Sequence, residues 1–237
     1  MYLDPAMVSV DPTATSVTTT WSTVEQMPDA LNITQVTAVE GTTVADSRVR
    51  VTTNVTNLGD GPVGIGIRYE WDLMIDGSDD SWFAERNPDS IWTETEIAYT
   101  PPAFERFETT NDPASPVFSI LGTVTGPSTF TPPPTPPDRF VYASWGASYG
   151  AAFDYTPTGM TGMDSAILYY WGNSEPNAIE LVPGGTVSVT QYLYAIPGAP
   201  PAPAPVPILT PIGIIALVGL LSVIAIATIR IRIKKRQ

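Results

Sequence analysis

The chain of 237 residues contains no cysteine and no histidine, and its first lysine is Lys234. Without cysteine it has no disulfide, thiolate nucleophile, zinc–thiolate site or iron–sulfur cluster. Without histidine it lacks the usual general base near neutral pH and the commonest transition-metal ligand. Any catalysis therefore has to use carboxylates, hydroxyls or tyrosines, and core packing has to hold the fold together.

Positive charge is scarce outside the C-terminal end. Residues 1–209 hold six arginines against all 24 acidic residues, a net charge of −18. Such a surface repels nucleic acid and favours cations, basic partners or a salty medium that screens self-repulsion. We therefore expect no nucleic-acid partner. Hydrophobic residues make up 43% of the chain, which is enough for a folded core despite 25 prolines.

An uncharged apolar run occupies residues 212–229, beginning with Ile212 and Gly213 and ending with Ile229. As a helix it would span about 27 Å, close to one bilayer crossing. A buried core helix is the alternative, but it would normally show a polar face, and one serine and one threonine are the only polar side chains here. The run predicts a single transmembrane helix.

The basic end that follows, residues 230–237, includes Arg230, Lys234 and Lys235. The positive-inside rule places such an end in the cytoplasm, so the N-terminal domain is predicted to lie outside, at the cell surface. The first residues, MYLDPAMVSVDPTATS, have neither the basic start nor the apolar run of a signal peptide. We therefore expect a signal-bearing segment upstream, with a fragmentary chain or the opposite orientation as alternatives.

Residues 197–211, PGAPPAPAPVPILTP, are rich in proline and alanine. This composition favours extended polyproline II structure and predicts a semi-rigid stalk of about 45 Å between the body and the membrane.

The proline-bearing motif PILTPIG, the apolar run and the terminal Arg/Lys cluster together resemble the tripartite C-terminal sorting signals of exosortase and archaeosortase substrates, especially those of archaeal surface proteins. The Pro-Glu-Phe or Pro-Gly-Phe triplet of the best-known motif is absent. The resemblance covers about the last 30 residues and implies an envelope protein whose partners are membrane lipid and a sortase-like processing enzyme.

Residues 1–196 show β patterns throughout, and they predict an all-β domain built as an antiparallel β-sandwich. Period-two alternation and β-branched residues mark strands at 32–39 and 48–56, and seven apolar residues share one face of a strand at 63–75. Further strands are expected at 91–99, 116–124, 139–145, 165–171 and 186–195. The pattern Asn-Leu-Gly-Asp-Gly, strand, Arg-Tyr-x-Trp-Asp also resembles uncharacterised β-sandwich domains of prokaryotic envelope proteins.

An acidic turn follows the strand at 63–75. Asp76, Ser78 and Asp80 place oxygens at alternate positions, as many calcium loops do at their start. The alternative is a plain acidic hairpin turn. We expect no resident cofactor, and calcium is the candidate ion.

Among the six tryptophans, Trp82 and Trp145 stand in polar or Gly/Ser surroundings and are the expected exposed pair. Exposed rings bind sugars by stacking on the apolar face of a pyranose. The alternative is burial in the core.

Two tripeptides, at Asn32 and at Asn54, match the N-glycosylation sequon. Residues 131–137 are rich in proline and predict a rigid surface loop.

Together these features predict a membrane-anchored cell-surface protein with a structural or adhesive role, whose partners are glycans or other envelope proteins. The sequence has no nucleophile elbow, phosphate-binding glycine loop or metalloprotease helix, so we expect no enzyme. The alternative function is a surface-displayed carbohydrate-binding module.

Overall fold

The computed structural model describes residues 8–13, 15–21, 31–43, 46–86, 90–151 and 153–197. The stalk beyond Pro197, the apolar run and the basic end lie outside this part, so their structures stay predictions. In the described ranges, no helix has the length and apolar character needed to cross a membrane.

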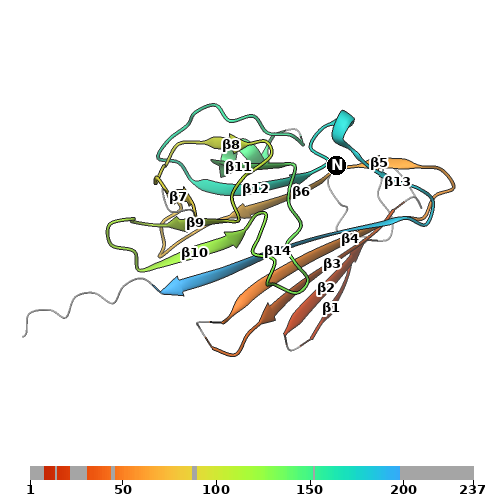
Figure 1. Cartoon of the computed structure of the whole chain (residues 1–237), viewed down its shortest axis with the longest axis horizontal. Helices are drawn as coiled ribbons and strands as arrows, with labels where there is room; N and C mark the ends of the chain where they lie inside the picture. The colour runs from red at the N-terminus through yellow and green to blue at the C-terminus, as the bar shows by residue number, and fades with distance from the viewer. Residues whose placement is uncertain are drawn as a thin grey trace, which may run out of the picture. The chain divides into compact units, whose positions relative to one another are not determined.

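Two antiparallel sheets make up the body, and the predicted all-β sandwich is confirmed (Figure 1). The larger sheet runs in the order β1 (Val8–Pro12), β2 (Ser16–Trp21), β3 (Leu31–Glu40), β4 (Arg48–Asn57), β14 (Thr186–Pro197), β10 (Phe118–Thr123), β9 (Arg106–Thr110) and β7 (Trp82–Glu85). The smaller sheet runs β6 (Ile67–Asp72), β12 (Ser165–Trp171), β11 (Arg139–Ser144) and β8 (Ile97–Tyr99), and β5 (Val63–Ile65) pairs with β13 (Ile179–Leu181). One short helix, α1 (Trp145–Tyr149), follows β11.

Aromatic side chains fill the core between the two sheets. The ring of Phe83 on β7 stacks on that of Tyr142 on β11, with the ring centres 5.2 Å apart. Phe140 meets Tyr169 edge to face at 5.1 Å. Each such pair adds about 0.5–1.5 kcal/mol beyond the burial of its area. Core packing can therefore hold the domain without disulfides, as the composition requires.

The predicted strand at 63–75 is wrong as a single element. The chain breaks at Gly66, so that β5 pairs with β13 while β6 joins the smaller sheet. A Cβ on Gly66 would lie 2.6 Å from the carbonyl oxygen of Gly172 and 2.7 Å from the ring of Phe153. The close approach requires glycine, and it lets the chain pass from one sheet to another.

The other predicted strands differ in how well they match. β3, β4, β10, β11, β12 and β14 lie where alternation placed them, within a few residues. The strand predicted at 91–99 is reduced to β8, preceded by isolated bridges at Thr93 and Thr95. The sequence analysis did not identify β1, β2, β7, β9 or β13.

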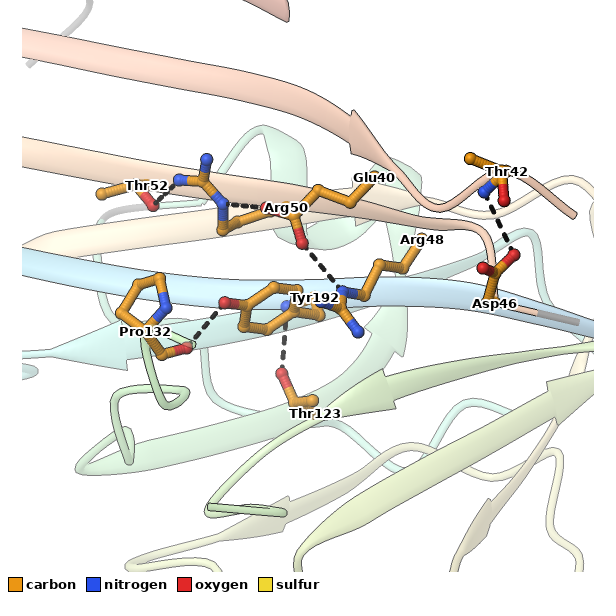
Figure 2. A network of polar contacts seen from close by, with 9 residues as sticks. All are labelled: Glu40, Thr42, Asp46, Arg48, Arg50, Thr52, Thr123, Pro132 and Tyr192. Atoms are coloured by element: carbon orange, nitrogen blue, oxygen red, sulfur yellow. Dashed lines mark hydrogen bonds and ion pairs between the residues drawn. The ribbon is translucent and has the colours of Figure 1, made fainter. Parts of the chain in front are cut away.

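The outer face of the larger sheet carries an arginine network (Figure 2). Arg48 and Arg50 both donate from Nε to the carboxylate of Glu40, at 2.8 and 2.6 Å. The guanidinium of Arg48 also lies 5.4 Å from the ring centre of Tyr192, whose hydroxyl donates to the carbonyl of Pro132 at 2.6 Å. The network ties β3, β4 and β14 to the proline-rich segment 131–137.

Glu96 is a buried carboxylate, 6% exposed, that precedes β8. Its Oε1 accepts from the backbone of Ser144 at 3.0 Å and the hydroxyl of Tyr155 at 2.7 Å. Its Oε2 accepts from the backbones of Thr158 at 2.7 Å and Met160 at 3.2 Å. Burial alone would raise the pKa of Glu96, but these hydrogen bonds outweigh it and lower the pKa from 4.5 to about 2. The charged side chain fastens the loop at 155–160 to β11.

We predict that Glu96→Gln destabilises the fold by about 2–3 kcal/mol at pH 7, because the amide loses the charge and turns an NH₂ group toward backbone donors. Since the folded pKa lies below the unfolded one, the contribution is full above about pH 4.5 and is lost as the pH falls toward 2. Denaturant unfolding of both proteins at pH 7 and pH 3 measures this. Glu180→Gln, on an exposed position of β13, is the control, and equal stability of Glu96→Gln and wild type at pH 7 would contradict the prediction.

Candidate functional site

A hollow of about 340 Å³ lies where the edge strand of the smaller sheet passes over the larger sheet. Residues of β3 and β4 form its floor, and consecutive residues of β6 form its wall. Its lining consists of Gln35, Thr37, Val51, Arg68, Tyr69, Glu70 and Trp71. The volume falls in the range of small-molecule sites.

The hollow is open because the two sheets differ in width. The hydroxyl of Tyr69 on β6 donates to Thr53 Oγ1 of β4 at 2.7 Å and approaches the carbonyl of Val189 on β14 at 3.5 Å. The edge of the smaller sheet therefore lies over β4 and β14, and in the described part of the chain β1, β2 and β3 continue the larger sheet beyond it (Figure 1). Of these three strands, β3 contributes residues to the lining of the hollow.

Thr53 connects the residues at the floor of the hollow through hydrogen bonds. Thr53 Oγ1 accepts the Tyr69 hydroxyl and also Nε2 of Gln35, at 3.2 Å. These contacts leave the side-chain oxygen of Gln35 available as an acceptor. Burial raises the pKa of Tyr69 to about 12, against the opposing effect of its hydrogen bond to Thr53, so the phenol is a neutral donor at every physiological pH.

The wall carries an ion pair. Arg68 Nη2 lies 2.5 Å from Glu70 Oε2, and both side chains are largely shielded from solvent. Ser148 of α1 donates from Oγ to Glu70 Oε1 at 2.7 Å, and its carbonyl accepts from Arg68 at 3.4 Å. The register with β12 places both side chains on the face of Leu168 and Tyr170, opposite the face that carries Tyr69 and Trp71.

Trp71 supplies the aromatic part of the wall. Its ring meets that of Tyr69 edge to face at 6.3 Å. Its Nε1 is buried and has no hydrogen-bond partner among the described residues, an arrangement that costs about 1–3 kcal/mol. Buried polar atoms without a partner are rare in folded proteins, so the unpaired indole N–H sets Trp71 apart from the other lining residues.

These groups define the ligand chemistry. An aromatic ring, an amide oxygen and the Thr37 hydroxyl suit a small molecule with one apolar face and several hydroxyl groups. In the described ranges, no group of three or more acidic side chains is placed to hold a metal ion.

The predicted calcium loop forms a tight turn. Asp76 has a φ of 54°, and Ile75 and Ser78 exchange backbone hydrogen bonds of 2.9 and 3.0 Å. Ser78 Oγ donates to the carbonyl of Asp80 at 3.3 Å, so the serine oxygen is already engaged. Calcium binding at this turn stays a prediction.

The two tryptophans predicted as an exposed pair are both half-buried and do not line the hollow. Trp82 lies on β7 opposite Thr110. Trp145 begins α1, where its ring stacks on the more exposed ring of Tyr149.

The two sequons lie side by side on the outer face of the larger sheet. Asn32 is the cross-strand partner of Thr56, and Asn54 is the partner of Thr34. Both asparagines are partly exposed. Their glycosylation stays a prediction.

The sequence analysis missed the hollow, although it contained one signal of it. Gln35 and Thr37 interrupt the apolar inward face of β3, between Ile33 and Val39. Polar residues at inward positions of a strand indicate either a buried hydrogen-bond network or an opening.

No known family model matches the chain, and no curated protein matches it. Solved structures do match. The Slr1438 protein from Synechocystis sp. PCC 6803 has a TM-score of 0.50 at 11% identity, over 79% of this chain and 65% of that one. The GalM/aldose epimerase homologue from C. elegans has a TM-score of 0.50 at 11% identity, over 80% and 68%. A galactose mutarotase related enzyme from Lactobacillus acidophilus has a TM-score of 0.49 at 10% identity, over 80% and 71%.

The chain thus spans 65% of the length of the Synechocystis protein. The expectation that the protein is not an enzyme is corrected, because the chain has a β-sandwich fold similar to that of a GalM/aldose epimerase homologue. At 11% identity the likeness shows the fold alone.

We predict that Thr53→Val destabilises the domain by about 1–3 kcal/mol, because it keeps the shape of the side chain and removes the acceptor that Tyr69 and Gln35 share. Denaturant unfolding followed by tryptophan fluorescence measures the change. Thr161→Val, at an exposed position, is the matched control. A stability equal to that of the wild type would show that the floor does not depend on this contact.

Proposed function

We propose that the protein is a carbohydrate-binding protein displayed at the cell surface, and that the hollow beside β6 holds a sugar. The observation that carries the proposal is the meeting of Trp71 with the polar residues Gln35 and Thr37 in the lining of one opening at the edge of β6. A pyranose offers the matching features: an apolar face and a ring of hydroxyls.

The charges favour a neutral sugar. The side chains of Arg68 and Glu70 balance each other. The body around them is strongly acidic, which repels uronic acids and sulfated sugars at low salt. Discrimination is expected to come from hydroxyl geometry, since buried polar groups left unpaired by a wrong ligand are costly.

The fold likeness supports the same ligand class. The C. elegans protein is named as a GalM/aldose epimerase homologue, and aldoses are the substrates that this name gives. The proposed sugar site of this chain rests on its own hollow, and the likeness adds that such sandwiches work on sugars in other proteins.

The proposed location at the cell surface is argued from the C-terminal sequence. The Pro-rich stalk, the apolar run at 212–229 and the basic end support an anchored protein whose partners are membrane lipid, glycans and an enzyme that processes the tail. A structural or adhesive role in the envelope agrees with sugar binding, because adhesion to a glycan is a common means of attachment.

We predict that Trp71→Ala abolishes saturable glycan binding, because it removes the ring on which the sugar stacks. An array of neutral and acidic glycans, probed with the detergent-solubilised full chain, measures it. Trp82→Ala is the control, since it removes an equal ring from β7, outside the hollow. Binding that survives Trp71→Ala, or an array with no saturable signal, would refute the proposed site.

We predict that protease added to intact cells removes the β-sandwich and leaves the basic end protected, because the apolar run separates them across the membrane. Mass analysis of the membrane-retained fragments measures this, and protease added to lysed cells is the control. Recovery of an intact sandwich from cells whose envelope admits the protease would contradict the surface location.

A further inference from the structure

Strand β6 lies at an open edge of the smaller sheet. In the described part of the chain it pairs with β12 on one side and with no strand on the other. An edge strand leaves alternate backbone N–H and C=O groups outside the ladder, where water, another chain or a ligand can bond to them. This edge runs along the hollow, because the lining contains four consecutive residues of β6, namely Arg68, Tyr69, Glu70 and Trp71.

The register with β12 identifies which backbone groups point to the open edge. In an antiparallel pair, hydrogen-bonded positions alternate with positions whose N–H and C=O point away from the partner strand. Leu73 lies opposite Ser165 and donates its N–H to the Ser165 carbonyl at 3.3 Å. Counting back two residues at a time, Trp71 and Tyr69 bond to β12 through their main chains. Glu70, between them, points its N–H and C=O to the open edge.

The other side of β12 shows the same alternation. Trp145, which follows β11, donates its N–H to the carbonyl of Asp164 at 2.8 Å. Asp164 therefore faces β11, and Ser165, the next residue, faces β6. The direction of the Glu70 main chain thus follows from two hydrogen bonds on opposite sides of one strand.

Glu70 reaches the hollow through its main chain and not through its carboxylate. The carboxylate lies on the opposite face of the smaller sheet, where it accepts from Arg68 Nη2 at 2.5 Å and from Ser148 Oγ at 2.7 Å. Among the described residues, no hydrogen bond is made to the N–H or the C=O of Glu70. Since a residue in a strand points both groups to the same side, the hollow receives one donor and one acceptor next to each other.

We infer that the main chain of Glu70 is the principal hydrogen-bonding group of the hollow, and that the ligand is a sugar that presents two adjacent free hydroxyl groups to it. This inference rests on the proposed function of the hollow. The Glu70 N–H donates to the oxygen of one hydroxyl, and its C=O accepts from the hydroxyl on the neighbouring carbon. Gln35 on the floor and Trp71 on the wall then contact the rest of the ring.

The pair of adjacent hydroxyls follows from the chemistry of the edge. A carboxylate or a fully ionised phosphate only accepts hydrogen bonds and would leave the carbonyl unpaired, whereas an ammonium group only donates and would leave the N–H unpaired. Hydroxyls both donate and accept, so two of them satisfy both groups. An added peptide strand needs a longer row of edge groups, and Asp72, the next edge-facing residue, lies outside the lining.

The first test removes the edge-facing N–H and leaves the ladder with β12 in place. Proline has no N–H, and an edge strand accepts it where that N–H would face away from the partner strand. Binding of the methyl glycosides of galactose, glucose and mannose to the detergent-solubilised full chain is measured by calorimetry. We expect Glu70→Pro to bind about tenfold more weakly than Glu70→Ala, which loses the same ion pair but keeps the N–H. Asp72→Pro, outside the lining, should bind as the wild type does.

Amide hydrogen exchange tests the same point in the unaltered protein, so its result does not depend on the folding of a variant. Without ligand, the Glu70 amide should exchange faster than the Tyr69 and Trp71 amides, which bond to β12. A saturating glycoside should slow exchange at Glu70 about tenfold or more and leave exchange at Asp72 unchanged.

The outcomes separate this inference from the function on which it rests. Equal binding by Glu70→Pro and Glu70→Ala, or an unchanged Glu70 amide in the complex, overturns recognition by the main chain. If Trp71→Ala still abolishes binding in that case, the hollow remains the sugar site. Equal loss in Glu70→Pro and Asp72→Pro assigns the loss to proline in β6, and the exchange at Glu70 then decides. Absence of saturable binding to every glycoside and glycan overturns both.

Discussion

The position of β6 over the larger sheet determines where the core between the sheets closes and where the hollow opens. Tyr69 fixes this position, because its hydroxyl is buried and has to find a partner, and Thr53 of β4 is that partner at 2.7 Å. On one side of this contact the two sheets close over the aromatic core. On the other side the larger sheet continues through β3, and the uncovered polar residues Gln35 and Thr37 become the floor of the hollow.

The body of the protein has few positively charged side chains, and most of them form ion pairs. The body has six arginines against 24 acids, and the ion pairs within the described ranges use five of these arginines, namely Arg48, Arg50, Arg68, Arg86 and Arg139. Isolated surface pairs stabilise a fold little, but four of these join neighbouring strands or a strand to a loop, and the fifth, Arg68–Glu70, lies within β6. Arg68 and Glu70 are the ion-paired residues among those that line the hollow, and Ser148 of α1 donates to Glu70 as well.

The sequence predicted the locations of individual strands better than the contacts between strands that are distant in the chain. Alternation and β-branching are local, and they located β3, β4 and β12. The break at Gly66 depends on its approach to Gly172, more than a hundred residues away, and no local pattern shows it. The hollow likewise joins residues of β3, β4 and β6 through long-range register. Trp71 looked like one more core residue of a strand, because nothing in the sequence indicates that β6 is an edge.

The same difference between local motifs and long-range fold explains why the sequence wrongly predicted that the protein is not an enzyme. The absence of histidine and of known motifs restricts which side chains could move protons, but it carries no information about the architecture, which is similar to that of a GalM/aldose epimerase homologue. In the hollow the restriction becomes specific, since Glu70 is the acidic residue of its lining and Arg68 and Ser148 hold its carboxylate in place. Tyr69 and Thr37 carry hydroxyls in the same lining, so the missing histidine leaves carboxylate and hydroxyl groups as the proton-carrying side chains there.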